Sequence, residues 1–168
     1  MSRRTFKARH AMGATVEGIA LVAKDGFSAR YDLDRVRGVF SRPQHQLAGE
    51  GYVGRILVLE TVKGGVASAW MLHDMKARGI CPLALVFNSV NPIIAQGAAL
   101  ADLPMLSGFD QDITSLVRSG DRIRVSPGDA TLEVMERGGC ASSDSATSIE
   151  THASQTNIRN VEEGLNNA

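Results

Sequence analysis

The sequence predicts an α/β fold in which a small barrel-like sheet carries packed helices. Three observations predict it: strands at the start, an alternation of strand and helix over residues 52–106, and a closing hairpin over residues 120–134. The chain has 168 residues, of which 43% are hydrophobic, so it suits one domain with a sizeable core. Basic and acidic side chains number 18 each, and this balance gives no support for a nucleic-acid partner.

The first ten residues are basic, and the first acidic residue is Glu17. A targeting leader is one interpretation of this segment. No long apolar stretch follows it, so we expect a flexible arm over residues 1–13 of a cytoplasmic protein. No run in the chain approaches the roughly 18 apolar residues of a membrane span, so we expect no membrane partner.

Three strands and a helix follow. Residues 15–23 are rich in aliphatic and β-branched residues and predict a strand, which Gly18 weakens. Residues 39–41 predict a short strand within a turn-rich segment, and residues 52–60 predict a long one. Residues 66–78 predict a helix, because apolar residues recur at helical spacing and a glycine follows the last turn.

The second half repeats the pattern. Residues 83–87 are continuously apolar and predict a buried strand. Asn91 is a suitable N-cap, with proline at the first turn, for a helix that ends near residue 102. Residues 104–106 predict a short strand and residues 112–118 a helical turn.

The last ordered unit is the hairpin, in which apolar and polar residues alternate around a Pro-Gly-Asp turn. Gly120 and Asp121 before it are interpreted as structural. Residues 138–168 shift to serine, threonine, asparagine and alanine, and we expect a disordered or weakly helical tail. The two cysteines are too few for an iron–sulfur cluster, which needs about four ligands, and the histidines show no metal-ligand spacing. We therefore expect no metal or cofactor in this chain.

The paired glycines between the long strand and the first helix are the candidate site. A helix start after glycines offers free N–H groups, which bind a carboxylate or a phosphate. The substrate-binding candidates here are Lys63, Gly64, Gly65, Val66 and Ala67. The pair is also consistent with a mere tight turn, and the lysine with a solvated charge.

Four further residues complete the candidates. Ser68, on the first helical turn, is the candidate catalytic residue; it is also placed to cap the helix or to pack, and no base stands beside it in the sequence. Ser28, Arg30 and His45 are candidates for substrate binding, and the histidine is also suited to a hydrogen bond within its own loop. Trp70 is expected in the core or at a partner interface rather than against a ligand.

The chain from about residue 16 to residue 135 resembles the swivel domain of aconitase X, also described as the aconitase X small subunit. Short matching segments carry the resemblance by their order and spacing: Glu17-Gly18, Phe27-Ser28, Gly38, His45, Leu47-Ala48-Gly49, Gly54-Arg55-Ile56-Leu57-Val58-Leu59, Trp70-Met71-Leu72, Gln96-Gly97-Ala98, Ala101-Asp102, Pro104 and Gly120-Asp121. The resemblance implies a swivelling β/β/α domain, which we place at residues 14–137.

The resemblance also implies a function. The chain would be the small subunit of a hydro-lyase, a dehydratase of a small anionic hydroxy acid such as cis-3-hydroxyproline or phosphomevalonate. A separate large subunit would hold the iron–sulfur cluster. One departure stands out, because the family loop places a hydroxyl directly after its glycine, whereas this chain has Gly65 and Val66 there. Either Ser68 substitutes, or this branch has a different substrate or chemistry. A non-catalytic metabolite-binding or assembly module, which keeps the fold without the family serine, is the alternative function.

Overall fold

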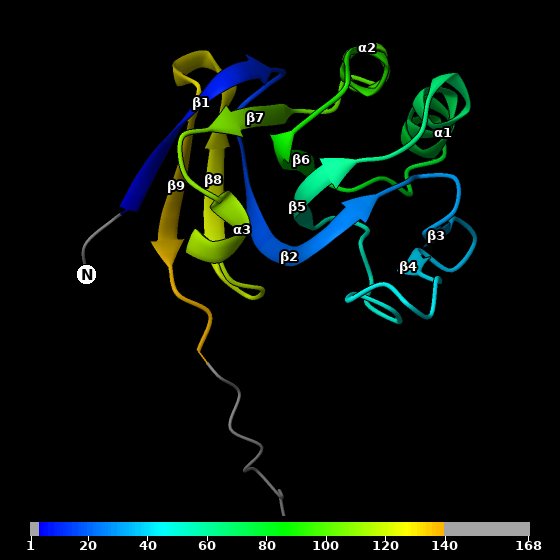
Figure 1. Ribbon diagram of the computed structural model, residues 1–168, viewed down its shortest axis with the longest axis horizontal. Helices are drawn as coiled ribbons and strands as arrows, with labels where there is room; N and C mark the ends of the chain where they lie inside the picture. Colours follow the sequence, from blue (N-terminus) through cyan, green and yellow to red (C-terminus); the bar gives the residue numbers. More distant parts are fainter. Residues whose placement is uncertain (1–3, 140–168) are drawn as a thin grey trace, which may run out of the picture.

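The computed structural model describes residues 4–139. Seven strands close into a barrel, which Figure 1 shows with two helices beside it. In barrel order, the strands are β1 (Arg4–Met12), β7 (Met105–Phe109), β6 (Ala84–Ser89), β5 (Ile56–Val62), β2 (Val16–Phe27), β8 (Arg122–Ser126) and β9 (Thr131–Glu136). The helices are α1 (Val66–Ala77), α2 (Pro92–Leu100) and α3 (Ile113–Leu116), and β3 (Leu33–Asp34) pairs with β4 (Val39–Phe40). The α/β class with a barrel-like sheet is thus confirmed.

Three neighbouring strand pairs of the barrel are parallel and the other four are antiparallel. Strands β2, β5, β6 and β7 run parallel, with Phe27 beside Val62 and Thr61 beside Ser89. The remaining pairs, which include the β8–β9 hairpin, are antiparallel. Because parallel strands share one direction, the loops after β2, β5 and β6 lie at the same edge of the sheet.

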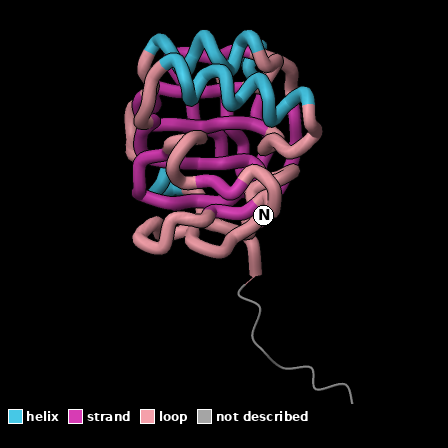
Figure 2. The backbone as a smooth tube through the Cα atoms, turned by 90° about the vertical axis from the view of Figure 1, so that its right-hand side faces the viewer, coloured by secondary structure: helices cyan, strands magenta, loops and turns pink. Residues whose placement is uncertain are grey.

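Two apolar clusters explain why the first four residues of β5 are all apolar. Ile56 and Val58 pack with residues of β8 and β9 across the barrel and therefore fill its interior. Leu57 and Leu59 belong to the other cluster, which lies between the sheet and the layer that contains α1 and α2. Figure 2 shows these two helices side by side over one face of the strands. A strand buried on both faces shows no alternation, as in other parallel sheets.

The expected flexible arm over residues 1–13 is wrong for residues 4–12. These residues form β1, which pairs with both β7 and β9 and so closes the barrel. Of its side chains, only Ala8 is fully buried, while the basic ones are exposed. The charges on the outer face therefore hide the strand pattern, and the closing contacts come from strands about 100 residues away in the chain.

The other elements lie within a few residues of the predictions. Strand β2 extends to Phe27, past the expected residue 23, and β3 was not predicted. Asp121 is structural, as expected: it is fully buried and accepts hydrogen bonds from Arg118 N, Gly138 N and Arg137 Nη1. Of the expected tail over residues 138–168, the part from residue 140 lies outside the described residues.

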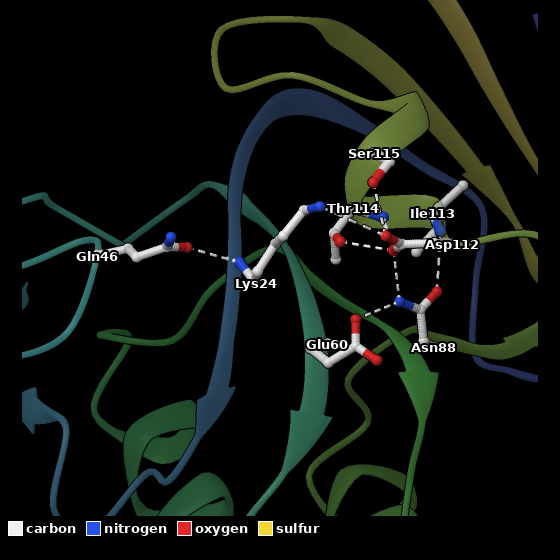
Figure 3. A network of polar contacts seen from close by, with 8 residues as sticks. All are labelled: Lys24, Gln46, Glu60, Asn88, Asp112, Ile113, Thr114 and Ser115. Atoms are coloured by element: carbon white, nitrogen blue, oxygen red, sulfur yellow. Dashed lines mark hydrogen bonds and ion pairs between the residues drawn. The ribbon is translucent and has the colours of Figure 1, made fainter.

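The short helix α3 closes one end of the barrel. Its Ile113 is buried in the interior cluster, and Asn88 on β6 accepts a hydrogen bond from the Ile113 N–H (2.9 Å). Asn88 Nδ2 donates to both Glu60 and Asp112, at 2.7 Å each, as Figure 3 shows. The side-chain amide of Asn88 thus bridges the two carboxylates and fixes α3 to the sheet.

Acidification is expected to weaken this end of the barrel. Hydrogen bonds from the Ser115 and Thr114 hydroxyls hold the pKa of Asp112 well below its usual range. A carboxyl with a depressed folded-state pKa stabilises the fold above its unfolded pKa of about 4 and loses that effect as the pH falls. The free energy of unfolding of Asp112→Asn should therefore lie below that of the wild type at neutral pH and converge with it in acid. Urea titrations from pH 7 to pH 2 measure this.

A neighbouring carboxylate supplies the control. Asp110 pairs with Arg9 at 2.8 Å, but both side chains are largely exposed. Asp110→Asn should leave the stability nearly unchanged at every pH, since exposed ion pairs contribute little. A deficit in Asp112→Asn that stays constant down to pH 2 would contradict the assignment.

Candidate functional site

The glycine loop lies at the carboxyl edge of the parallel strands. It follows β5 directly, and the Lys63 N–H donates to the carbonyl of Phe27 at the end of β2 (2.6 Å). The Lys63 side chain runs along β2, since a Cβ placed on Gly26 would meet its Cε at 2.6 Å. The loop after β5 is therefore held against the loop after β2, which carries Ser28.

The start of α1 is a set of uncapped amides. Gly65 occupies the N-cap position and provides no side-chain hydrogen bond. The other two helices differ, because Asn91 caps Ile94 N in α2 and Asp112 caps Thr114 N in α3. The first N–H groups of a helix have no partner within it, and the helix dipole makes this end partly positive. The start of the 12-residue helix α1 can therefore bind an anion.

Asn91 also orients the glycine loop. Its Nδ2 donates to the carbonyl oxygen of Gly64 (3.1 Å), while its Oδ1 caps α2. In a planar trans peptide the carbonyl and the next N–H point in opposite directions. The Gly65 N–H is therefore turned away from α2. The sequence identified Asn91 only as a cap, because nothing local indicates its second contact.

Two serine hydroxyls converge beneath Gly64. A Cβ placed on this glycine would overlap Ser68 Oγ and lie 3.7 Å from Ser28 Oγ. Both serines are almost fully buried, at 2% and 4% exposure, and Ser28 Oγ has no hydrogen-bond partner in the described chain. The structure thus brings together Ser28, Gly64 and Ser68. It also places the Ser68 hydroxyl below the loop rather than on its open side.

No base accompanies these hydroxyls. Among residues 4–139, no hydrogen bond joins Ser28 Oγ or Ser68 Oγ to a carboxylate or an imidazole. Serine is a weak proton acceptor or nucleophile without such a neighbour. The arrangement can therefore bind an anion by itself, whereas proton transfer requires a group supplied by a substrate or a partner.

A buried aspartate supports the Ser28 turn. Asp32 is fully buried, and its Oδ2 accepts from Ser28 N (2.8 Å) while its Oδ1 accepts from Arg42 Nη1 (3.0 Å). The Arg42 guanidinium reaches solvent, so one charge of the pair is hydrated. Sequence reasoning missed both residues, since an aspartate in a charged, turn-rich segment gives no sign that it is buried.

The remaining candidates lie off the loop. Arg30 is exposed on the Ser28 turn, with its guanidinium 5.3 Å from the Tyr31 ring centre. His45 is buried and stacks on Phe40 at 4.7 Å, and its Nδ1 accepts from Leu47 N. That bond leaves Nε2 as the protonated nitrogen, which has no partner in the described part of the chain. No contact that the structure records joins either residue to Gly64.

Two absences concern the described residues alone. No helix within residues 4–139 is long and apolar enough to cross a membrane. Nor does that segment hold three or more histidine, cysteine, aspartate or glutamate side chains arranged around a possible metal ion.

Comparison with known proteins adds the relatives of this site. A family model described as "Aconitase X swivel domain" matches residues 5–134. The "phosphomevalonate dehydratase small subunit" of Archaeoglobus fulgidus is 30% identical over 131 residues, which cover 78% of this chain and 98% of that protein. The protein of the same description from Methanococcoides burtonii is 30% identical over 121 residues, or 72% and 88% of the two chains.

A solved structure has the same fold. The crystal structure of Thermococcus kodakaraensis aconitase X, in its holo-form, aligns with a TM-score of 0.73 at 26% identity. The alignment covers 79% of this chain and 99% of that one. The glycine loop and both serines lie within the part that the family model matches.

Proposed function

This chain belongs to the aconitase X swivel-domain family, and we propose that it is the small subunit of an aconitase X-type hydro-lyase. In this proposal it closes over a site in a separate large subunit, in the cytoplasm. The observation that carries the proposal is the uncapped start of α1 at the carboxyl edge of the barrel. A family of dehydratase small subunits needs such a place for the anionic group of its substrate.

The substrate would be a small anionic hydroxy acid, either phosphomevalonate-like or similar to cis-3-hydroxyproline. Its phosphate or carboxylate would accept hydrogen bonds from the N–H groups of residues 64–67. Lys63 is exposed beside the loop, so its charge is available to attract the anion. Ser28 and Arg30, on the neighbouring turn, and His45, on the loop between β4 and β5, would be the further substrate-binding residues.

An iron–sulfur cluster does not fit this chain. Clusters need about four thiolate ligands, and the described residues contain one free cysteine, Cys81. No group of metal-ligating side chains in residues 4–139 supplements it. We therefore assign the cluster to the large subunit, and the role of this chain is to bind and orient the substrate and to exclude water.

Ser68 is the proposed catalytic hydroxyl. Its Oγ lies directly below Gly64, so a small opening of the loop would bring it to a substrate held on the amides. Ser68→Ala in the reconstituted, cluster-loaded pair should lower kcat by about 100-fold or more with phosphomevalonate or cis-3-hydroxyproline, the usual cost of a lost acid–base group. Steady-state rates of dehydration measure this.

Ser107→Ala is the matched control. Ser107 is equally buried, lies on β7, and has a hydroxyl without a partner in the described chain. This variant should retain wild-type activity. Full activity of Ser68→Ala would reject its catalytic role, and a loss confined to Ser28→Ala would assign the role to that serine.

A non-catalytic binding or assembly module is the second candidate. The absence of a hydroxyl at positions 65 and 66 and the burial of Ser68 favour it. Calorimetry of the isolated chain with each substrate separates the two functions. Tight binding without any turnover by the reconstituted pair would support the module, whereas turnover that depends on this chain would exclude it.

A further inference from the structure

The outer face of the two packed helices is apolar. The inner face of α1 buries Leu72 and Met75, and that of α2 buries Ile94 and Ala98. Yet large apolar side chains also lie on the opposite side of both helices, exposed by 42 to 67%: Val66, Trp70, Ile93 and Leu100. These four residues, which we call the α1–α2 patch, line a groove together with Ala69, His73, Gln96 and Gly97, and no aspartate, glutamate, lysine or arginine is among the lining residues. Packing on the core of this chain explains the apolar residues on the inner side of the two helices, but not those on the outer side.

The base of the groove is fixed by close helix packing. A Cβ placed on Gly97 would lie 2.6 Å from the Cβ of Ala69, so the two helices touch at this point. Such an approach needs glycine and leaves little freedom for the helices to move apart. The α1–α2 patch is therefore a preformed surface, and a partner would bind to it with little loss of conformational entropy.

Trp70 has the character of an interface anchor. It is the single tryptophan of the chain and is 66% exposed, which excludes the core position that the sequence left open. Its ring contacts His73 edge-on, with 6.1 Å between the ring centroids. Tryptophan is enriched among the residues that contribute most to protein–protein affinity, in pockets that exclude water.

The patch is continuous with the glycine loop. Val66 follows Gly65 directly, and Trp70 lies one turn further along the same helix, about 6 Å along its axis. If the loop completes a site in another subunit, that subunit must come within a few ångströms of Val66. A protein surface that covers Val66 would then cover Trp70 as well.

We propose that the α1–α2 patch is the surface on which the large subunit docks, with Trp70 inserted into an apolar pocket of that subunit. This inference rests on the proposed function, because the partner is the subunit that holds the rest of the site. It specifies the contacting residues, which the proposed function leaves open. A second copy of this chain, or its own residues 140–168, are the competing occupants.

Binding to the purified large subunit from the same genome tests the docking surface. Calorimetry without substrate should show that Trp70→Ala weakens the complex by about 30-fold or more, as expected for an anchor residue. Val36→Ala is the matched control, since Val36 is 86% exposed on the β3–β4 turn, which contacts the C-terminal end of α1 through the hydrogen bond from Arg78 to the carbonyl of Arg35. This control should bind within twofold of the wild type. Circular dichroism should be unchanged in both variants.

The single tryptophan also allows a direct readout. In a chain labelled with 5-fluorotryptophan, the one ¹⁹F resonance should shift when the large subunit is added. Wild-type affinity of Trp70→Ala, or an unmoved resonance in the bound complex, would overturn the proposal. So would a resonance that moves with the concentration of the isolated chain, or on removal of residues 140–168, because the patch would then be covered by a second copy or by the chain itself.

The two proposals fail separately. If Trp70-dependent binding occurs but the pair dehydrates neither substrate, the docking surface stands and the dehydratase function falls. If the pair is active while Trp70→Ala binds normally, the function stands and the docking surface is wrong.

Discussion

Gly64→Ala is expected to slow dehydration by the reconstituted pair severely. Gly64 has a φ angle of +112°, which side chains other than that of glycine rarely adopt, and a methyl group there would overlap Ser68 Oγ. The substitution should therefore displace both the amides at the start of α1 and the serine beneath them. A displacement of about 1 Å in a substrate-positioning group costs about 100-fold in rate, so we expect at least that loss in kcat/KM.

The same change should lower the free energy of unfolding by about 2 kcal/mol or more, since backbone strain and steric overlap add. Gly49→Ala separates these two effects. Gly49 also has a positive φ, +87°, but no atom lies within 4 Å of its added Cβ. Gly49→Ala should introduce only backbone strain, which lowers the free energy of unfolding by about 1 kcal/mol, and it should retain activity. Wild-type kcat/KM for Gly64→Ala would show that the loop does not contact the substrate.

Asp32→Ala should cause the largest loss of stability. The carboxylate is fully buried and accepts hydrogen bonds from Ser28 N and Arg42 Nη1, so its removal leaves a buried N–H unpaired. Breaking a buried ion pair costs about 3–5 kcal/mol, and the exposure of Arg42 reduces this to about 2–4 kcal/mol. Urea unfolding monitored by circular dichroism measures the loss.

A double-mutant cycle identifies the cause. If the loss comes from the pair, Asp32→Ala combined with Arg42→Ala should cost less than the sum of the two single changes. Asp34→Ala is the control, because its carboxylate caps the nearby turn from an exposed position and should matter less. Strict additivity in the cycle, or equal losses for Asp32→Ala and Asp34→Ala, would contradict this account.

Local signals in the sequence were sufficient for the central elements. Strand β5 begins with enough apolar residues to be recognised on its own. Helix α1 has apolar residues at helical spacing and a glycine after its last turn, and α2 begins with a capping asparagine. The alternating β8–β9 hairpin is equally local. These features depend on neighbours a few residues apart, so they can be predicted without the fold.

The sequence by itself therefore determined the order of the strands and helices from β5 to β9, the glycine loop and the family resemblance. Only the tertiary structure decided that residues 4–12 close the barrel, that Ser28 lies beside Gly64, that Asp32 is buried and that Trp70 is exposed. The reason is physical: the pairing of β1 and the position of Ser28 depend on strands and loops distant in the chain, and the burial of Asp32 and the exposure of Trp70 depend on how the whole chain packs. A serine or an aspartate looks the same in sequence whether water or a buried N–H is its partner.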